Sequence, residues 1–181
     1  MVGVEESESD VRAVLAAFGN GYRDRDLSQL DAFIELFDDG AEMIGIEATR
    51  RGSDEWFEGR AAIKEIVESD WRVWGDVEVN VASALVTVVD GVAWASIEAT
   101  LGQPADSGEA ISSYLQRMSD LLDDTGLDPA GRMMEATSFG LARLRERNLG
   151  PDHAWPLVIT AVLTLGPAGW RFRNIHWSTP P

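Results

Sequence analysis

Two pairs of strand-like segments constrain the fold of this chain more than any other feature. Residues 77–89 and 92–101 are rich in β-branched side chains, and Asp90-Gly91 between them favours a two-residue hairpin turn. Residues 157–165 and 170–178 form a second pair around Gly166-Pro167-Ala168-Gly169. The sequence therefore predicts a mostly antiparallel, curved sheet, and such a sheet needs an apolar layer of helices on one face.

Three segments ahead of the first hairpin have the apolar spacing of amphipathic helices, with a short strand at 41–46 before the third. We expect the helices at about 9–23, 28–37 and 60–69, with residues 1–8 as a disordered arm. The first helix would bury one stripe of side chains: Val11, Val14, Leu15, Phe18 and Tyr22.

Between the two hairpins, residues 103–155 read as an insert of two helices. Asp128-Pro129 marks the start of the second helix, because Asp caps helices and Pro is tolerated in the first turn. The predicted order is ααβαββ, two inserted helices, then ββ. We interpret residues 1–181 as one α+β domain that carries this insert.

Composition narrows the classes of function. The chain has 181 residues, a net charge of −16 and no cysteine. The absence of cysteine excludes disulfides and thiolate metal sites, and the charge disfavours binding to nucleic acid. No apolar run is long enough to cross a membrane, and the acidic N-terminal segment does not resemble a secretory signal. We therefore expect a soluble, cytoplasmic protein.

Four short pieces of the sequence form a recognisable series along the chain. They are Leu36-Phe37-Asp38-Asp39-Gly40-Ala41, Gly59-Arg60-Ala61-Ala62-Ile63, Asp70-Trp71 with Trp74, and Gly169-Trp170-Arg171-Phe172-Arg173 through His176-Trp177-Ser178. In this order and spacing, they resemble the SnoaL-like/NTF2-like superfamily. The resemblance implies a cystatin-like cone, in which a curved sheet and the three N-terminal helices enclose a pocket, often in a homodimer. The superfamily includes ketosteroid isomerase, polyketide cyclases, dehydratases and non-enzymatic binding or assembly domains, so the fold alone does not give the function.

The comparison with ketosteroid isomerase can be made residue by residue. The position of that enzyme's catalytic Asp falls here on Gly45, which has no side chain. The position of its Tyr falls on Phe18, and Tyr22 reaches it only if the helix shifts by one turn. Both differences argue against ketosteroid isomerase chemistry.

The strongest polar candidates lie on the predicted strands. Trp94, Ser96 and Glu98 alternate onto one face of their strand, and Phe172, Asn174 and His176 share a face of the last strand. If these faces line a pocket, Glu98 and His176 are candidate catalytic residues that act as acid and base. In the alternative interpretation, the Glu98 face meets solvent or a dimer partner, and His176 is a structural histidine.

Aromatic residues supply the candidate ligand contacts. We expect Trp56, Trp71, Trp94 and Phe172, with Asn174, to line a pocket for a small apolar molecule, although a tryptophan more often packs in a core. No spacing of histidines or carboxylates indicates a metal site, and no glycine-rich loop indicates a nucleotide or another cofactor.

Three functions remain open at this point. The first is a pocket domain that binds a small apolar molecule, as a homodimer. The second is an enzyme of the cyclase, isomerase or dehydratase type that uses Glu98 and His176. The third is an assembly module with the inserted helices as its partner surface.

Overall fold

The computed structural model describes residues 4–46, 48, 50–51, 55–102, 108–148 and 154–179. The chain divides into two compact units, of which unit 1 is Met1–Gly102 with Ala154–Pro181 and unit 2 is Gln103–His153. Unit 1 contains α1 (Val4–Asp24), α2 (Leu30–Ile34), β1 (Phe37–Ile44), β2 (Trp56–Glu58), α3 (Gly59–Val73), β3 (Asp76–Val79), β4 (Leu85–Val89), β5 (Val92–Gly102), β6 (Ala154–Gly166) and β7 (Gly169–Ser178).

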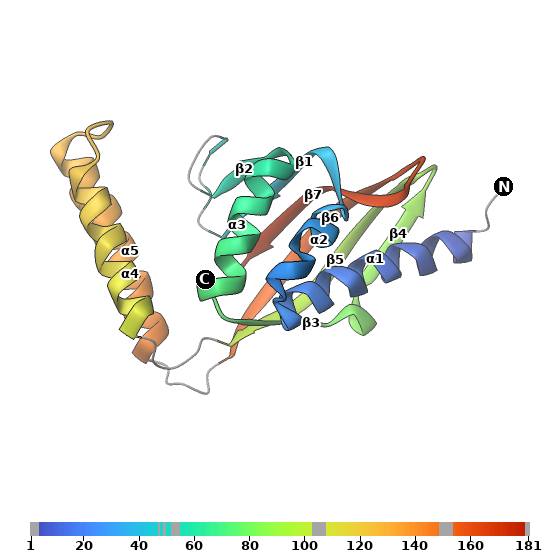
Figure 1. The fold of residues 1–181 in the computed structure, drawn as a ribbon, viewed down its shortest axis with the longest axis horizontal. Helices are drawn as coiled ribbons and strands as arrows, with labels where there is room; N and C mark the ends of the chain where they lie inside the picture. Colours follow the sequence, from blue (N-terminus) through green and yellow to red (C-terminus); the bar gives the residue numbers. More distant parts are fainter. Residues whose placement is uncertain are drawn as a thin grey trace. The chain divides into compact units, whose positions relative to one another are not determined.

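The strands of unit 1 form one curved, seven-stranded sheet in the order β2-β1-β7-β6-β5-β3, with β4 also paired to β5 (Figure 1). The β5–β6 ladder runs without interruption from Val92 opposite Thr164 to Gly102 opposite Ala154. It joins the two predicted hairpins in a single sheet. β1 pairs in parallel with β7, and the other ladders are antiparallel. The predicted α+β fold with a mostly antiparallel sheet is therefore confirmed.

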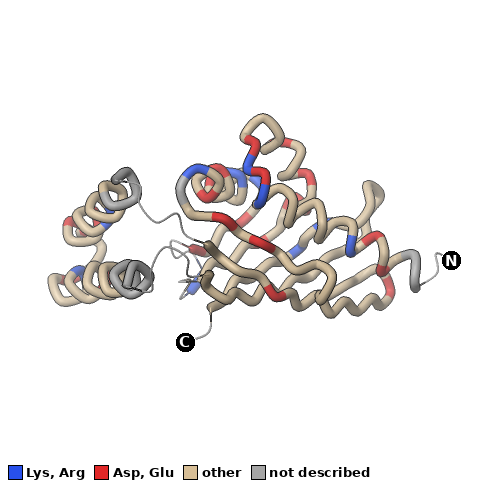
Figure 2. The backbone as a smooth tube through the Cα atoms, turned by 90° about the horizontal axis from the view of Figure 1, so that it is seen from below, with Lys and Arg blue, Asp and Glu red and all other residues tan. Residues whose placement is uncertain are grey.

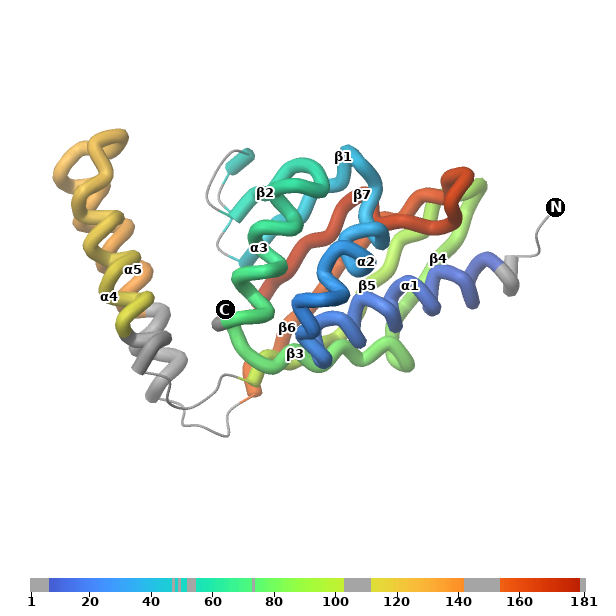
Figure 3. The backbone as a smooth tube through the Cα atoms, in the orientation of Figure 1, coloured from blue at the N-terminus to red at the C-terminus, as the bar shows by residue number. Residues whose placement is uncertain are grey.

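Within the described part of unit 1, helices cover one face of this sheet and leave the other uncovered. In Figures 1 and 3, α1, α2 and α3 lie on the same side of the sheet. Burial alternates strictly along β5, where Ala93, Ala95 and Ile97 are buried and the residues between them are exposed. The side of β5 that faces the helices thus carries small or apolar residues.

Two glycines let α1 approach its neighbours closely. A Cβ atom at Gly21 would lie 2.3 Å from the ring of Phe33, and one at Gly19 would lie 3.1 Å from Val79 Cβ. Glycine ordinarily weakens a helix interior. Here α1 continues to Asp24, because close packing against α2 and β3 offsets that cost.

Several predicted boundaries are wrong. The expected arm 1–8 is helical from Val4, and an ion pair between Glu8 and Arg12, one turn apart, supports this first part of α1. The second helix ends before Phe37, which instead begins β1 opposite Phe172. Residues 77–89 are two strands rather than one, because a 3₁₀ turn at Val81–Ser83 interrupts them. Asn80 stabilises this turn, since its Oδ1 accepts a bond from the Ser83 amide at 3.3 Å.

The third helix is longer than predicted, with consequences for the site. α3 runs to Val73, so Asp70 and Trp71 lie on the helix and not after it. Its inward positions are Ile63 and Val67, and Asp70 and Trp71 continue the same stripe by one turn.

Unit 2 is a helical hairpin of α4 (Gly108–Asp123) and α5 (Pro129–Asn148). Asp128 caps α5 as predicted, because its Oδ1 accepts a bond from the Gly131 amide at 2.7 Å. The expected insert 103–155 thus corresponds to unit 2, except that the last two residues of that range belong to β6.

None of the described helices is long and apolar enough to cross a membrane. Acidic positions are spread along the backbone of unit 1 and do not gather on one element (Figure 2).

Candidate functional site

An aromatic cluster fills the space between the sheet and the helices of unit 1. Phe18 is fully buried, and its ring centroid lies 5.0–5.7 Å from those of Tyr22, Phe33, Phe172 and Trp177. Such tilted and edge-on pairs pack more favourably than their buried area alone implies. The cluster ends at the last turns of α1 and α3, where polar groups begin.

The first of these polar groups is a pair formed by Tyr22 and Asp70. The Tyr22 hydroxyl donates a hydrogen bond of 3.0 Å to Asp70 Oδ2. Burial raises the pKa of Asp70 to about 7; the Tyr22 bond lowers this pKa and the charge of Glu55 raises it. Burial and the neighbouring carboxylate also raise the pKa of Tyr22 well above its usual value. A carboxyl with a pKa near 7 can both donate and accept a proton at neutral pH.

A second carboxylate, that of Glu55, lies beside the end of β1. A Cβ atom built on Gly45 would lie 2.4 Å from Glu55 Oε2, so only glycine leaves room for this side chain. The Gly45 amide also donates a 2.8 Å hydrogen bond to the Glu55 carbonyl. The lack of a side chain at Gly45 argued against isomerase chemistry in the sequence. In the structure, it leaves space for the Glu55 carboxylate near Asp70.

Two tryptophans, each following one of these carboxyl residues in the sequence, have buried indole nitrogens. The Nε1 atoms of Trp71 and Trp56 are shielded from solvent and have no hydrogen-bond partner among the described residues. Trp71 is only 5% exposed and packs edge-on against Phe33, with centroids 5.0 Å apart. Trp56 is half-buried on β2, with the Arg51 guanidinium 5.9 Å from its ring centroid. We name Tyr22, Glu55, Trp56, Asp70 and Trp71 together the Asp70 site.

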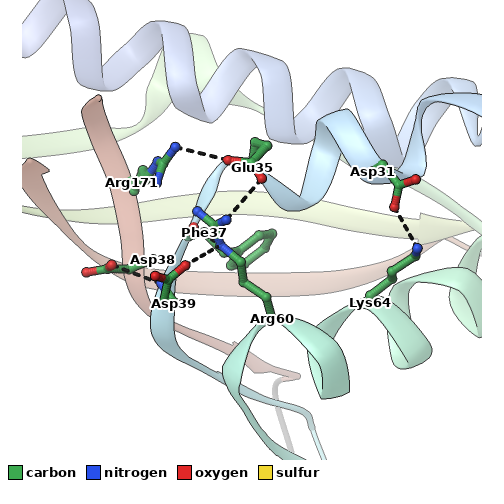
Figure 4. A network of polar contacts seen from close by, with 8 residues as sticks. All are labelled: Asp31, Glu35, Phe37, Asp38, Asp39, Arg60, Lys64 and Arg171. Atoms are coloured by element: carbon green, nitrogen blue, oxygen red, sulfur yellow. Dashed lines mark hydrogen bonds and ion pairs between the residues drawn. The ribbon is translucent and has the colours of Figure 1, made fainter. Parts of the chain in front are cut away.

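The other end of α3 carries a different polar cluster, the Arg60 network, whose charged side chains all take part in hydrogen bonds or ion pairs (Figure 4), although Arg60 Nη2 is buried without a partner among the described residues. Arg60 Nε donates to the Phe37 carbonyl at 2.8 Å, and Arg60 Nη1 pairs with Glu35 at 3.0 Å. Glu35 also binds Arg171 at 3.0 Å, and Lys64 binds Asp31 at 2.6 Å. These contacts join β1, α2, α3 and β7. Phe37, Arg60 and Arg171 lie in the segments that carry the sequence resemblance.

The structure corrects the predicted position of the β5 candidates. Trp94 and Glu98 lie on the exposed face of β5, and Trp94 is 48% exposed. The prediction that this face lines a pocket is wrong, because the alanines of β5 allow the helices to approach the opposite face closely.

The faces predicted for β7 are wrong for a second reason. Val162 pairs with Asn174 and Leu163 with Phe172, so Arg173 is an extra residue in a β-bulge. Phe172 is therefore fully buried in the aromatic cluster, whereas Asn174 is half-buried and donates to Glu42 Oε2 at 3.4 Å. His176 is exposed on the uncovered face.

Glu98 and His176 do not face one another across a buried cavity. β6 lies between their strands, so their backbones are about 10 Å apart across the sheet alone. Both side chains are exposed. The acid–base pair predicted from the sequence is contradicted by this geometry.

The sequence contains a signal for the site that replaces this pair. Asp70 occupies a position of α3 that follows Ile63 and Val67 on the buried side of the helix. A carboxyl in such a stripe must be desolvated, and this shifts its pKa. Tyr22 similarly ends the apolar stripe of α1 with a hydroxyl.

Within the described residues, no group of three His, Cys, Asp or Glu side chains could hold a metal ion.

Comparisons with known proteins identify the fold. No protein-family model and no curated protein matches the chain. Among solved structures, an NTF2-like protein of unknown function from Pseudomonas putida has a TM-score of 0.59 at 16% identity, over 97% of this chain and 88% of the other. A candidate dehydratase of the NTF2-like family from Streptomyces avermitilis has a TM-score of 0.59 at 13% identity, over 98% of both chains.

A third structure extends the range of functions found on this fold. A candidate association domain of calcium/calmodulin-dependent protein kinase II from Xanthomonas campestris has a TM-score of 0.53 at 13% identity, over 95% of this chain and 86% of the other. With the sheet order and the helix-covered face described above, these likenesses show that the chain has the cystatin-like fold of NTF2-like proteins.

Proposed function

We propose that the Asp70 site binds a small, largely apolar molecule that carries a neutral hydrogen-bonding oxygen. The observation that carries this proposal is the pair of buried indole nitrogens, Trp56 Nε1 and Trp71 Nε1, which have no partner among the described residues. Buried donors are nearly always satisfied in native proteins, and a ligand oxygen would satisfy them here.

The charges around the site select against an anionic ligand. Glu55 and Asp70 are close enough for the charge of Glu55 to raise the pKa of Asp70. A ligand carboxylate or phosphate would add a third negative charge in a chain whose net charge is already −16. A ketone, aldehyde or alcohol on an apolar body suits both the indole donors and the aromatic cluster.

A binding experiment with Nile red, a neutral apolar dye with a carbonyl oxygen, tests this proposal. Trp71→Phe keeps an aromatic ring and removes the indole donor, so we expect at least a fivefold loss of affinity in a fluorescence titration. Trp94→Phe on the exposed face is the matched control and should change nothing. Loss of binding in the Trp94 variant with full binding in the Trp71 variant would place the dye on the outer face and overturn the proposal.

A proton-transfer enzyme is the second candidate function. Asp70, with a pKa of about 7, suits a general acid or base, and one structure with this fold is described as a candidate dehydratase. The test is deuterium exchange, followed by NMR, at the carbon next to the carbonyl of cyclohexanone. Exchange catalysed by the wild type should be lost in Asp70→Asn and kept in Glu98→Gln. Equal exchange rates in the wild type and Asp70→Asn would exclude this role.

Homodimer formation is the remaining part of the proposal, through the uncovered face of the sheet. This face exposes five large apolar side chains: Leu85, Val89, Val92, Trp94 and Val158. Exposed apolar groups gathered on one face commonly mark a protein interface.

A further inference from the structure

We infer that the α4–α5 hairpin associates with the same hairpin of a second copy of the chain to form a four-helix bundle. The first observation is that the described part of the hairpin buries little apolar surface of its own. Among its described side chains, only Ala136 is buried as an apolar residue, at 3% exposure. Five large apolar side chains are exposed instead: Leu115, Leu122, Met133, Met134 and Leu141. Two helices that bury so little gain stability from an additional apolar layer.

The spacing of apolar residues on α4 indicates two neighbours. One seam faces α5: Tyr114 stacks edge-on against Phe139, with centroids 6.1 Å apart, and Met118 lies against Gly140. A second seam contains Leu115, Met118 and Leu122, with spacings of three and four residues. Residues spaced in this way lie on one side of a helix. A helix with two adjacent apolar seams is typical of a bundle with more than two helices.

The exposed residues of α5 continue this surface. Leu122 and Arg132 are level in the hairpin, because Arg132 Nη1 donates to the Leu122 carbonyl at 3.2 Å. The side chain of Met133 points about 100° away from that of Arg132 around the helix axis, because the two residues are consecutive in α5. In an antiparallel pair, this rotation brings Met133 to the same side as Leu115 and Leu122. We define the hairpin face as Leu115, Leu122 and Met133.

Charge favours a second copy as the occupant. In this acidic chain, two copies repel each other over most of their surface. The hairpin is different, because α4 has an excess of carboxylates and α5 an excess of arginines. The charged residues of α4 are Glu109, Arg117, Asp120 and Asp123, and those of α5 are Arg132, Glu135, Arg143, Arg145, Glu146 and Arg147. Placing α4 of one copy beside α5 of the other therefore pairs opposite charges.

The size of the hairpin face suits a reversible dimer. α4 is about 24 Å long at 1.5 Å per residue, and two adjacent helices are about 20 Å wide. The face thus covers about 500 Å² per copy, or about 1,000 Å² in a dimer, which is near the lower limit for specific interfaces. Association should therefore depend on protein concentration.

Sedimentation velocity of the full chain over a range of concentrations is the first test. The variant Leu115→Gln with Leu122→Gln keeps helix propensity and charge, so we expect its dissociation constant to rise at least tenfold. The matched control, Leu27→Gln with Leu165→Gln, removes two exposed apolar groups of unit 1 that lie outside the uncovered face of the sheet, and should leave the dissociation constant unchanged. A wild-type chain that is monomeric at every concentration, or association lost only in this control variant, would overturn the inference.

Cross-linking gives a second test that does not require the hairpin variant to fold. The chain has no cysteine, so an introduced cysteine is the only thiol. Met133→Cys on the hairpin face should form a covalent dimer with a short bismaleimide linker. Ser113→Cys lies about half a turn away from Leu115 and should form much less. Equal yields from the two variants, or no product from Met133→Cys, would count against a four-helix bundle.

Discussion

The two ends of α3 place ionisable side chains in two different environments. At its first turn, Arg60 binds the Phe37 carbonyl and the carboxylate of Glu35. Ten residues later, about 15 Å along the helix, Asp70 is held by a neutral phenol, and its pKa is raised to about 7. The first arrangement stabilises the fold. The second leaves a carboxyl that is costly to ionise, which is typical of a functional site.

The largest test of this difference is the pH dependence of stability. The pKa of Asp70 is higher in the folded state than its usual value of 3.8, so the folded state holds this proton more tightly. Its ionisation has no effect on stability below about pH 4, destabilises the fold increasingly from pH 4 to 7, and has its full effect above pH 7. That effect is at most on the order of 4 kcal/mol.

Asp70→Asn removes this ionisation and should accept the same Tyr22 bond. We expect the variant to match the wild type near pH 4 and to exceed it in unfolding free energy at pH 8. Denaturant unfolding at both values measures the difference. If the unfolding free energies of the two proteins depended on pH in the same way, Asp70 would not be costly to ionise and would not differ from the charged groups at the other end of α3.

The second test concerns the paired end. Arg60→Met should lower the free energy of unfolding by about 2 kcal/mol, because the Phe37 carbonyl and Glu35 lose a charged donor. Lys64→Met is the matched control. Lys64 forms an exposed pair with Asp31, so its removal should lower the free energy of unfolding less than the removal of Arg60 does. A larger effect at Lys64 than at Arg60 would show that Arg60 is not the centre of the network.

The third test sharpens the description of the Asp70 site. Tyr22→Phe keeps the ring and removes the 3.0 Å bond to Asp70, at a cost of about 1 kcal/mol. Because that bond lowers the pKa of Asp70, the pKa should rise further in the variant. A carboxyl NMR titration detects this shift, and a fall in the pKa would contradict the assigned role of Tyr22.

The smallest expected effect is that of salt. The net charge of −16 creates repulsion among exposed carboxylates, and screening should raise the melting temperature between low and moderate NaCl. The Arg60 network would lose part of its exposed ion pairing under the same conditions. A melting temperature that falls with added NaCl would mean that the network outweighs the surplus of carboxylates.

Much of the fold followed from local patterns. Asp90-Gly91 and the β-branched runs beside it predicted the β4–β5 hairpin, and Asp128-Pro129 predicted the start of α5. The site was harder to predict, because the side of a strand that faces the core depends on its neighbours. The small residues Ala93 and Ala95 face the helices, and Trp94 faces outward.

By itself, the sequence determined the types and order of most elements, since periodicity and turn residues act over a few neighbours in the chain. It did not predict the short strand β2 or the division of residues 77–89 into β3 and β4. Only the tertiary structure decided that the bulge at Arg173 reverses the faces of β7 and that Tyr22 meets Asp70 from another helix. These features depend on contacts between segments far apart in the chain, and desolvation at such a contact, not residue type, raises the pKa of Asp70.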